Sequence, residues 1–524
     1  MGEGQHPTFE ELLQKEGIEA LSNEDLFERI GLLIDFSQDP LHEFGIVRAL
    51  DFADLLEARA LTETEKALLH YFRSNAHANA RQIHLAKLNV TWLWDEPHRT
   101  DSILQLRRAL NSAGFPSLAR LRQTQILTNL GNEMNGAGRL VDAGDYWRRA
   151  LQIEPTFWMA QGNWGYAQFY YAQSLYDPGH RAVMLWTAHR NLTSAIALAD
   201  QYPDFGHSDA REAFERYAKL IEGGANLELI AQSADLDGHS LGETADEQDY
   251  RKWCLHERLI LNPLNDIGPH SIAAQDVMTL PSFVTELDEP PVFTGFFNQM
   301  KQEFASARWL YYEGTRREDT THFSDLGVRL YNTLDYPAYG LKVEKVKLAF
   351  KASYSIFDKI AYFLNAYFKL GIPQNAVNFN AVWRVKSGKA IRPEFVQDVN
   401  WPLRGLYYIS KDFFEPGVKE HTEPDAQAVN ELRNHLEHKY VKVHEMLLDR
   451  AGAFDPFKDT LAYSITRDNL EQKSLRLLKQ ARSGLIHLSL AMHWEERRRA
   501  TGRTGRTGYN ATMPLQIWDD EWKQ

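Results

Sequence analysis

Apolar residues recur every three or four positions along most of the chain, and stretches that alternate with a period of two are short and rare. A spacing of three and four places apolar side chains on one face of an α-helix. The clearest apolar stripe lies within residues 342–370 and consists of Val343, Val346, Phe350, Tyr354, Phe357, Ala361, Leu364 and Phe368. Similar spacing predicts helices over residues 296–315, 424–448 and 459–499, with a shorter helix from Leu403. We therefore expect an all-α protein. The three long helices at 342–370, 424–448 and 459–499, together with the shorter one, predict a four-helix bundle in its C-terminal part.

A second pattern, nearer the N-terminus, is typical of the tetratricopeptide repeat. The large, small and helix-ending positions of that repeat are occupied by Leu127, Leu130, Gly131, Met134, Ala143, Trp147, Ala150 and Pro155. Gly165 follows Gly131 at the 34-residue period of the repeat. The pattern predicts a TPR-like helical solenoid in which each repeat packs mainly on its neighbours and offers a concave surface to a partner. A plain helical bundle with one accidental match is the alternative.

Turn-forming residues divide the remainder of the chain. They occur at residues 235–240, 262–266 and 289–291, between the repeat-like region and the bundle. The predicted organisation is an N-terminal helical cap at 1–54, the TPR-like solenoid at 55–225, a connector packed on the bundle at 226–300, a helical domain at 301–505 and a tail at 506–524.

Composition narrows the class of protein. The chain has 524 residues and a single cysteine, Cys254, so neither an intrachain disulfide nor a cysteine-rich zinc site is possible. We expect a cytoplasmic protein, because a reducing compartment fits this cysteine usage and because no apolar run approaches the roughly 18 residues of a membrane-spanning helix.

Charge is distributed unevenly along the chain. Residues 341–524 hold 29 basic and 22 acidic side chains, whereas residues 1–340 hold 29 and 49. The basic C-terminal part could bind a polyanion while the acidic remainder repels it. Simple solubility charge explains the same asymmetry, and both interpretations stay open.

The candidate for chemistry is a pair of residues, Arg433 and His438. Phosphate-binding loops, GxSxG and HExxH motifs are missing from the sequence. An imidazole can transfer a proton near neutral pH, and a guanidinium can hold a phosphate, so an Arg with a His suits phosphodiester chemistry. The Arg-x4-His spacing occurs four times, but only this pair has an asparagine, Asn434, directly after the Arg and a tyrosine, Tyr440, two residues after the His.

Helix geometry restricts how this pair could act. At 100° per residue, positions 433 and 438 lie about 140° apart around an ideal helix, so a site shared between two chains is easier to build. Asp358 or Glu313 could pair with Arg433 or orient His438, although each suits an ordinary structural role. The alternative interpretation is that His438 is simply exposed and that Arg433 forms a surface ion pair with Glu437, one turn on.

The segment Arg433-Asn434-x3-His438-x-Tyr440 resembles the Arg-x4-6-His motif of the HEPN superfamily, whose members are compact helical bundles and include metal-independent ribonucleases. Further segments are similar to a prokaryotic HEPN subfamily coupled to tetratricopeptide repeats, and they are Tyr250-Arg-Lys-Trp-Cys254, Asn262-Pro-Leu-Asn265, Glu303-Phe-Ala-Ser-Ala-Arg308, residues 350–365 and Leu403-Arg-Gly-Leu-Tyr407. The resemblance covers residues from about 240 to 500. It implies that Arg433 and His438 are the catalytic pair, that Asn434 is the polar residue after the Arg, and that Tyr440 is a modification or cleft site.

These observations together predict a HEPN-type endoribonuclease that uses the RNA's own 2′-hydroxyl, without a metal or other cofactor. By resemblance it would act in phage defence or as a toxin and would form a homodimer through the C-terminal bundle. Glu437 and Asp358 would support the catalytic pair, and the TPR-like region would bind a protein or peptide partner. The alternative is a non-catalytic helical adaptor that binds RNA and uses the repeat array for protein recognition.

Overall fold

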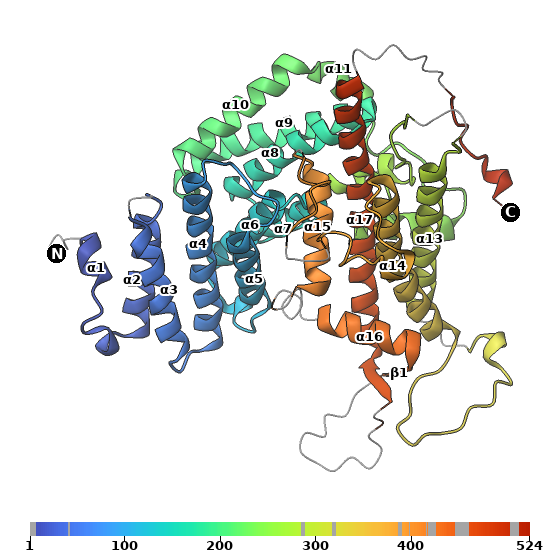
Figure 1. Ribbon diagram of the computed structural model, residues 1–524, viewed down its shortest axis with the longest axis horizontal. Coiled ribbons are helices and arrows are strands. Elements are labelled where there is room, and N and C mark those ends of the chain that lie inside the picture. The colour runs from blue at the N-terminus through green and yellow to red at the C-terminus, as the bar shows by residue number, and fades with distance from the viewer. Residues whose placement is uncertain are drawn as a thin grey trace.

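The computed structural model confirms the all-α fold class and describes most of the chain (Figure 1). The described residues are 7–39, 42–284, 289–316, 321–385, 390–397, 399–415, 417, 426–445, 459, 461–503 and 513–523. Within them, no helix is both long and apolar enough to cross a membrane.

The N-terminal half is a succession of helices, most of which pack on the next helix along the chain (Figure 1). They are α1 (Phe9–Leu13), α2 (Asn23–Phe36), α3 (Glu43–Glu57), α4 (Glu63–Lys87), α5 (Pro97–Asn111), α6 (Arg120–Gly136), α7 (Leu140–Ile153), α8 (Trp158–Ser174), α9 (Pro178–Gln201), α10 (Ser208–Gly224), α11 (Leu227–Ser233) and α12 (Ala245–Glu257). Short 3₁₀ helices lie at Ile18–Ala20, Phe115–Ser117, Pro203–Phe205, Pro263–Asp266 and Ser271–Ala273.

The repeat-like residues form the pair α6 and α7. Gly131 of α6 lies against Trp147 of α7 so closely that a Cβ atom at Gly131 would sit 2.7 Å from the indole Nε1. In the next pair, a Cβ at Gly165 of α8 would lie 2.9 Å from the carbonyl oxygen of Ala188 in α9. The small residues therefore permit close helix packing at the places that the pattern indicated. The boundaries predicted for the cap, solenoid, connector and tail stay predictions.

The C-terminal half is a helical bundle with a small strand pair at one end (Figure 1). Its elements are α13 (Val292–Thr315), α14 (Leu341–Tyr367), α15 (Trp401–Phe414), α16 (Ala426–His438), β1 (Tyr440–His444), β2 (Ala462–Thr466) and α17 (Arg467–Arg503), with 3₁₀ helices at Phe323–Asp325, Gln374–Ala376 and Asp520–Trp522. Helix α14 packs on α13 and α17, and α15 packs on α17. The stripe predicted for α14 is buried, as Phe350, Phe357 and Leu364 show.

Two of the predicted helices have the wrong bounds. Helix α16 ends at His438, and the following residues form β1, which pairs in parallel with β2 from Tyr440 opposite Ala462 to His444 opposite Thr466. The segment Tyr-Val-Lys-Val-His suits an extended chain because valine and tyrosine favour strands. Residues 446–458, which include the end of the helix expected over 424–448, lie outside the described residues.

The two halves share a buried polar interface, and its centre is α15. Arg404 of α15 is fully buried and donates to the Glu96 carboxylate at 3.0 Å. Lys411 reaches Asp95 at 2.6 Å, and Asp412 accepts from Arg107 at 2.8 Å. Helix α5 packs mainly on its neighbours α4 and α6, as expected, and in addition its Arg107 contributes a buried charge to the interface with α15.

Backbone contact reinforces this interface. Gly138, in the turn between α6 and α7, has a φ of 87°, and a Cβ atom there would lie 2.3 Å from the carbonyl oxygen of Trp401. A Cβ at Gly405 of α15 would in turn lie 2.4 Å from the Gly138 carbonyl oxygen. His487 of α17 is buried with its Nε2 3.0 Å from the same carbonyl oxygen. Only glycines permit the turn and α15 to approach this closely.

Candidate functional site

The structure separates the four Arg-x4-His pairs by their surroundings. Arg482 and His487 are buried in α17, where the Arg482 guanidinium donates to Asp266 at 2.6 Å, so this pair belongs to the core. Arg251 and His256 lie on α12, and Arg317 falls outside the described residues.

Arg433 and His438 lie on α16, a helix at one end of the bundle next to β1 (Figure 1). Helix α16 also packs against α14 and α15, so the bundle fixes its position. The pair therefore lies at the surface of the bundle on a helix with four neighbouring elements, α14, α15, β1 and β2. We call Arg433, Glu437 and His438, together with Asp358 and Tyr354 of α14, the α16 site.

Arg433 is held by two carboxylates and one ring. Its Nε lies 3.3 Å from Glu437 Oε1, one turn along α16, and its Nη2 lies 3.4 Å from Asp358 Oδ2 of α14. The guanidinium carbon stands 4.4 Å from the centre of the Tyr354 ring, in a cation–π contact. Because these partners come from two helices, the guanidinium has a defined position while 31% of the side chain stays exposed.

His438 is the last residue of α16, and 75% of its side chain is exposed. Its Nε2 lies 3.8 Å from Glu437 Oε2, while the other oxygen of the same carboxylate faces Arg433. Glu437 thus contacts both residues, one through each carboxylate oxygen.

The other predicted residues are nearby but not joined to this group. Asn434 is exposed on α16. Tyr440, the first residue of β1, is 43% exposed, and its hydroxyl donates to the Asp459 carboxylate. Among the described residues, no hydrogen bond or ion pair links either of them to Arg433 or His438. Glu313, the second acidic candidate, pairs instead with Lys345 at 2.8 Å.

Sequence reasoning missed Tyr354 as a part of this site. Tyr354 is only 3% exposed, and its place in the apolar stripe of α14 suggested a core residue. The available signal was its position four residues before Asp358, which puts both side chains on one face of α14. The Tyr354 ring therefore packs in the core and also contacts the guanidinium of Arg433.

Burial perturbs the titration of this group. It raises the pKa of the Asp358 carboxyl, against the lowering effect of Arg433. It also raises the pKa of Tyr354 to about 12, so the phenol stays neutral at physiological pH. For Arg433, burial lowers the pKa, but Tyr354, Glu437 and Asp358 together raise it by more. The α16 site thus keeps a permanent cation beside an exposed imidazole.

Comparison with protein families identifies the region that contains this site. Residues 284–495 match the family model described as LA2681-like HEPN. These residues form a HEPN domain. The match extends from just before α13 into α17 and includes all of α14, α15 and α16, so Arg433 and His438 lie within the HEPN domain. No curated protein matches the chain. No solved structure matches it either.

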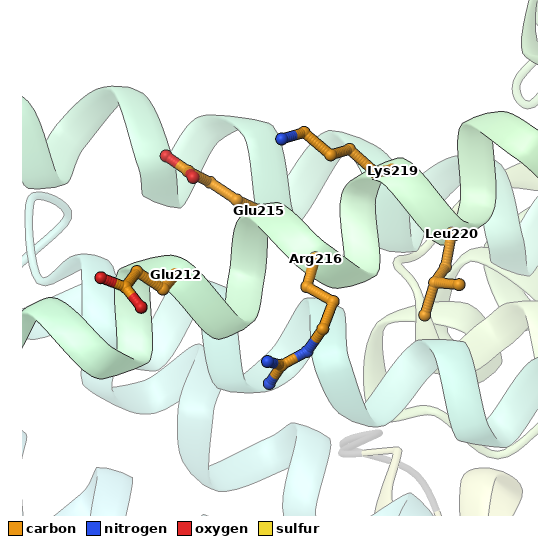
Figure 2. A pocket seen from close by; sticks show the side chains of 5 residues that line it. All are labelled: Glu212, Glu215, Arg216, Lys219 and Leu220. Atoms are coloured by element: carbon orange, nitrogen blue, oxygen red, sulfur yellow. The ribbon is translucent and has the colours of Figure 1, made fainter.

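A pocket on α10 offers no comparable chemistry. Figure 2 shows that its lining side chains all come from this one helix, and it encloses about 430 Å³. The lining residues are Glu212, Glu215, Arg216, Lys219 and Leu220. Helix α10 lies outside the range that matches the HEPN family, so this surface hollow is separate from the α16 site.

Proposed function

We propose that the HEPN protein is a metal-independent endoribonuclease and that Arg433 and His438 are its catalytic residues. The observation that carries the proposal is the α16 site itself, in which an anchored guanidinium and an exposed imidazole flank one carboxylate within the HEPN domain. A guanidinium has five N–H donors, which is more than its two carboxylate contacts require. Arg433 can therefore bind phosphate oxygens without leaving its place.

The reaction uses the nucleophile that RNA supplies. The 2′-oxygen attacks the adjacent phosphorus, the bond from phosphorus to the 5′-oxygen breaks, and a 2′,3′-cyclic phosphate and a free 5′-hydroxyl result. His438 takes the proton from the 2′-hydroxyl or gives one to the leaving 5′-oxygen, and Arg433 stabilises the charge on the pentavalent phosphate. DNA lacks the 2′-hydroxyl and is not a substrate for this step.

One imidazole cannot stand on both sides of the same phosphate, which favours a site built by two chains. In a homodimer with the two α16 helices facing each other, one His438 would act as base and the partner subunit's His438 as acid. The exposed position of His438 at the end of α16 supports this arrangement, because the described residues leave 75% of its side chain open to a partner. The basic residues of the C-terminal part supply attraction for the RNA backbone.

The direct test is cleavage of a labelled RNA by the full-length protein in excess EDTA, with a DNA of the same sequence alongside. We expect RNA products that end in a 2′,3′-cyclic phosphate, intact DNA, and at least about a 100-fold loss of rate in Arg433→Ala and in His438→Ala, since general acid–base catalysis contributes 10²–10⁴-fold. Arg251→Ala and His256→Ala are matched controls, because they remove the same residues at the same spacing on α12.

The results separate two classes of protein. The ion pairs of Arg433 with Asp358 and Glu437 also fit a purely structural Arg, which favours a non-catalytic RNA-binding adaptor as the second candidate. An adaptor would bind RNA without cutting it and would keep its RNA affinity in His438→Ala. Cleavage that survives His438→Ala, requires magnesium or cuts DNA equally would contradict the ribonuclease mechanism.

The role of the N-terminal helices follows from the same proposal. We infer that the TPR-like region binds a protein or peptide whose arrival regulates the nuclease, as in phage defence or a toxin. Support comes from the buried interface between α5 and α15, since α15 also packs on α16. Cleavage measured with and without residues 1–62, which precede α4, tests whether the outermost helices regulate the enzyme.

A further inference from the structure

Three side chains on α4 and α5, outside the residues that match the HEPN family, lie close together. One ligand atom from each of His77, His98 and Asp101 lies within 4.8 Å of the other two. His98 and Asp101 are three residues apart, so they share one face of α5, and His77 faces them from α4. The His77 and His98 rings have centres 5.8 Å apart.

These histidines differ from ordinary buried ones. The Nδ1 atoms of both rings are shielded from solvent and have no hydrogen-bond partner among the described residues. The His77 Nδ1 comes no closer than 4.0 Å to the Asp101 carboxylate. Leaving buried polar atoms unpaired is costly, so a structural histidine normally finds partners for both nitrogens. Two unpaired ring nitrogens close to one carboxylate suit a ligand that accepts lone pairs.

The neighbouring contacts between α4 and α5 make the contrast sharper. Along the same faces, His70 Nδ1 lies 2.8 Å from Gln105 Oε1 and Ser74 Oγ lies 2.9 Å from Ser102 Oγ. These are two successive polar links between the helices, about one turn apart. At the third level, where His77 meets His98 and Asp101, the polar groups are present but no direct bond joins them.

We propose that His77, His98 and Asp101 form a site for a divalent transition-metal ion, with zinc the best match. Two imidazoles and one carboxylate are ligands that zinc, cobalt and nickel accept, whereas magnesium and calcium prefer oxygen alone. In tetrahedral zinc sites with bonds of about 2.0–2.1 Å, ligand atoms stand roughly 3.3 Å apart. The present spacing of up to 4.8 Å is wider, so the three side chains would have to move closer together to bind the ion.

Charge and access fit a metal ion. Burial is the main factor that lowers the pKa of His77 and of His98, which keeps both imidazoles in the neutral form that binds metals. Asp101 supplies one negative charge, and its side chain is 47% exposed, which leaves a path from solvent and room for a water in the fourth position. The ion would fasten α4 to α5, the helix that supplies Arg107 to the HEPN domain.

The test is titration of the untagged, full-length, metal-stripped protein with zinc by calorimetry, and with cobalt by visible absorption. We expect one ion per chain, an absorption typical of mixed nitrogen and oxygen coordination, and a zinc-dependent rise in melting temperature. His77→Leu, His98→Leu and Asp101→Asn should each weaken binding at least tenfold, since changes outside the ligands alone cost about 10–100-fold. His256→Ala, at an exposed position of α12, should bind as the unmodified chain does.

The melting temperature of each variant without metal shows whether that variant is folded. Because both Nδ1 atoms already lack partners, the leucine variants should melt close to the unmodified metal-free protein and lose only the zinc-dependent rise. The absence of saturable binding by the unmodified chain would overturn the proposal. So would binding that is unchanged in the His77→Leu, His98→Leu double variant. Neither result depends on whether the α16 site cleaves RNA.

Discussion

Asp412 of α15 is the residue whose removal should most weaken the attachment of the HEPN domain to the N-terminal helices. The carboxylate is buried, and it accepts from Arg107 Nη1 at 2.8 Å and from Arg107 Nη2 at 3.1 Å. Arg139, at the start of α7, donates to its other side. One carboxylate therefore pairs with two buried guanidinium groups, and Asp142 supplies the second negative charge through its pair with Arg139.

The size of the effect follows from what Asp412→Ala leaves behind. Arg107 is 2% exposed and Arg139 is 3% exposed, so neither can turn to water when the carboxylate is removed, although Arg139 keeps its pair with Asp142 at 3.0 Å. Breaking one buried ion pair costs about 3–5 kcal/mol. With an unfolding entropy of about 2.1 cal/mol/K per residue, a chain of 524 residues that melts as one unit should lose roughly 3–5 °C.

Calorimetric melting with a surface control checks this reasoning. Glu344→Ala removes an exposed carboxylate that pairs with Lys347 at 2.8 Å, and such surface pairs contribute about 0–1 kcal/mol. We expect Asp412→Ala to lower a single shared transition and Glu344→Ala to leave it almost unchanged. Two separate transitions, or an Asp412→Ala protein that melts with the unmodified chain, would refute the interface argument.

The stabilisation that Asp412 contributes through these ion pairs should depend on pH. Burial raises the pKa of Asp412, but Arg107 and Arg139 lower it by more, so the folded pKa lies below the unfolded value of about 3.9. The stabilising contribution is therefore complete above about pH 4 and is lost as the pH falls through the folded pKa. The difference in melting temperature between Asp412→Ala and the unmodified chain should shrink below pH 4.

Two further predictions concern the α16 site. Light scattering at micromolar concentration should show a dimer joined through the HEPN domain, and a monomer, or a dimer joined only through residues before 230, would contradict the two-chain site. Tyr440→Trp should slow RNA cleavage, because it adds bulk to an exposed ring two residues from His438. Unchanged cleavage would show that Tyr440 lies away from the bound RNA.

Local patterns in the sequence predicted the elements whose stability is local. The stripe of α14 and the small residues of α6 and α7 are repeated within a few turns, so a single sequence reveals them. The ion pair between Asp412 and Arg107 joins residues 305 positions apart, and no periodic pattern in the sequence predicts it. Both partners lie in ordinary amphipathic helices, in which the sequence predicts that a charged residue faces solvent. Their burial depends on how α15 meets α5, which only the folded chain shows.

The sequence could not predict where α16 ends, because the residues there fit both the period of a helix and that of a strand. Leu432, Leu436, Tyr440 and Val443 continue a helical stripe, whereas Val441 and Val443 alternate with polar neighbours as a strand does. The strand forms because β2 lies parallel to it and buries Val441 and Val443.

The end of α16 also determines the geometry of the candidate site. With the helix ended at His438, the imidazole occupies an exposed terminus, and Glu437 contacts both His438 and Arg433. The two residues are therefore linked through one carboxylate although they lie about 140° apart on an ideal helix, and their exposure at the edge of the bundle keeps a two-chain site geometrically open.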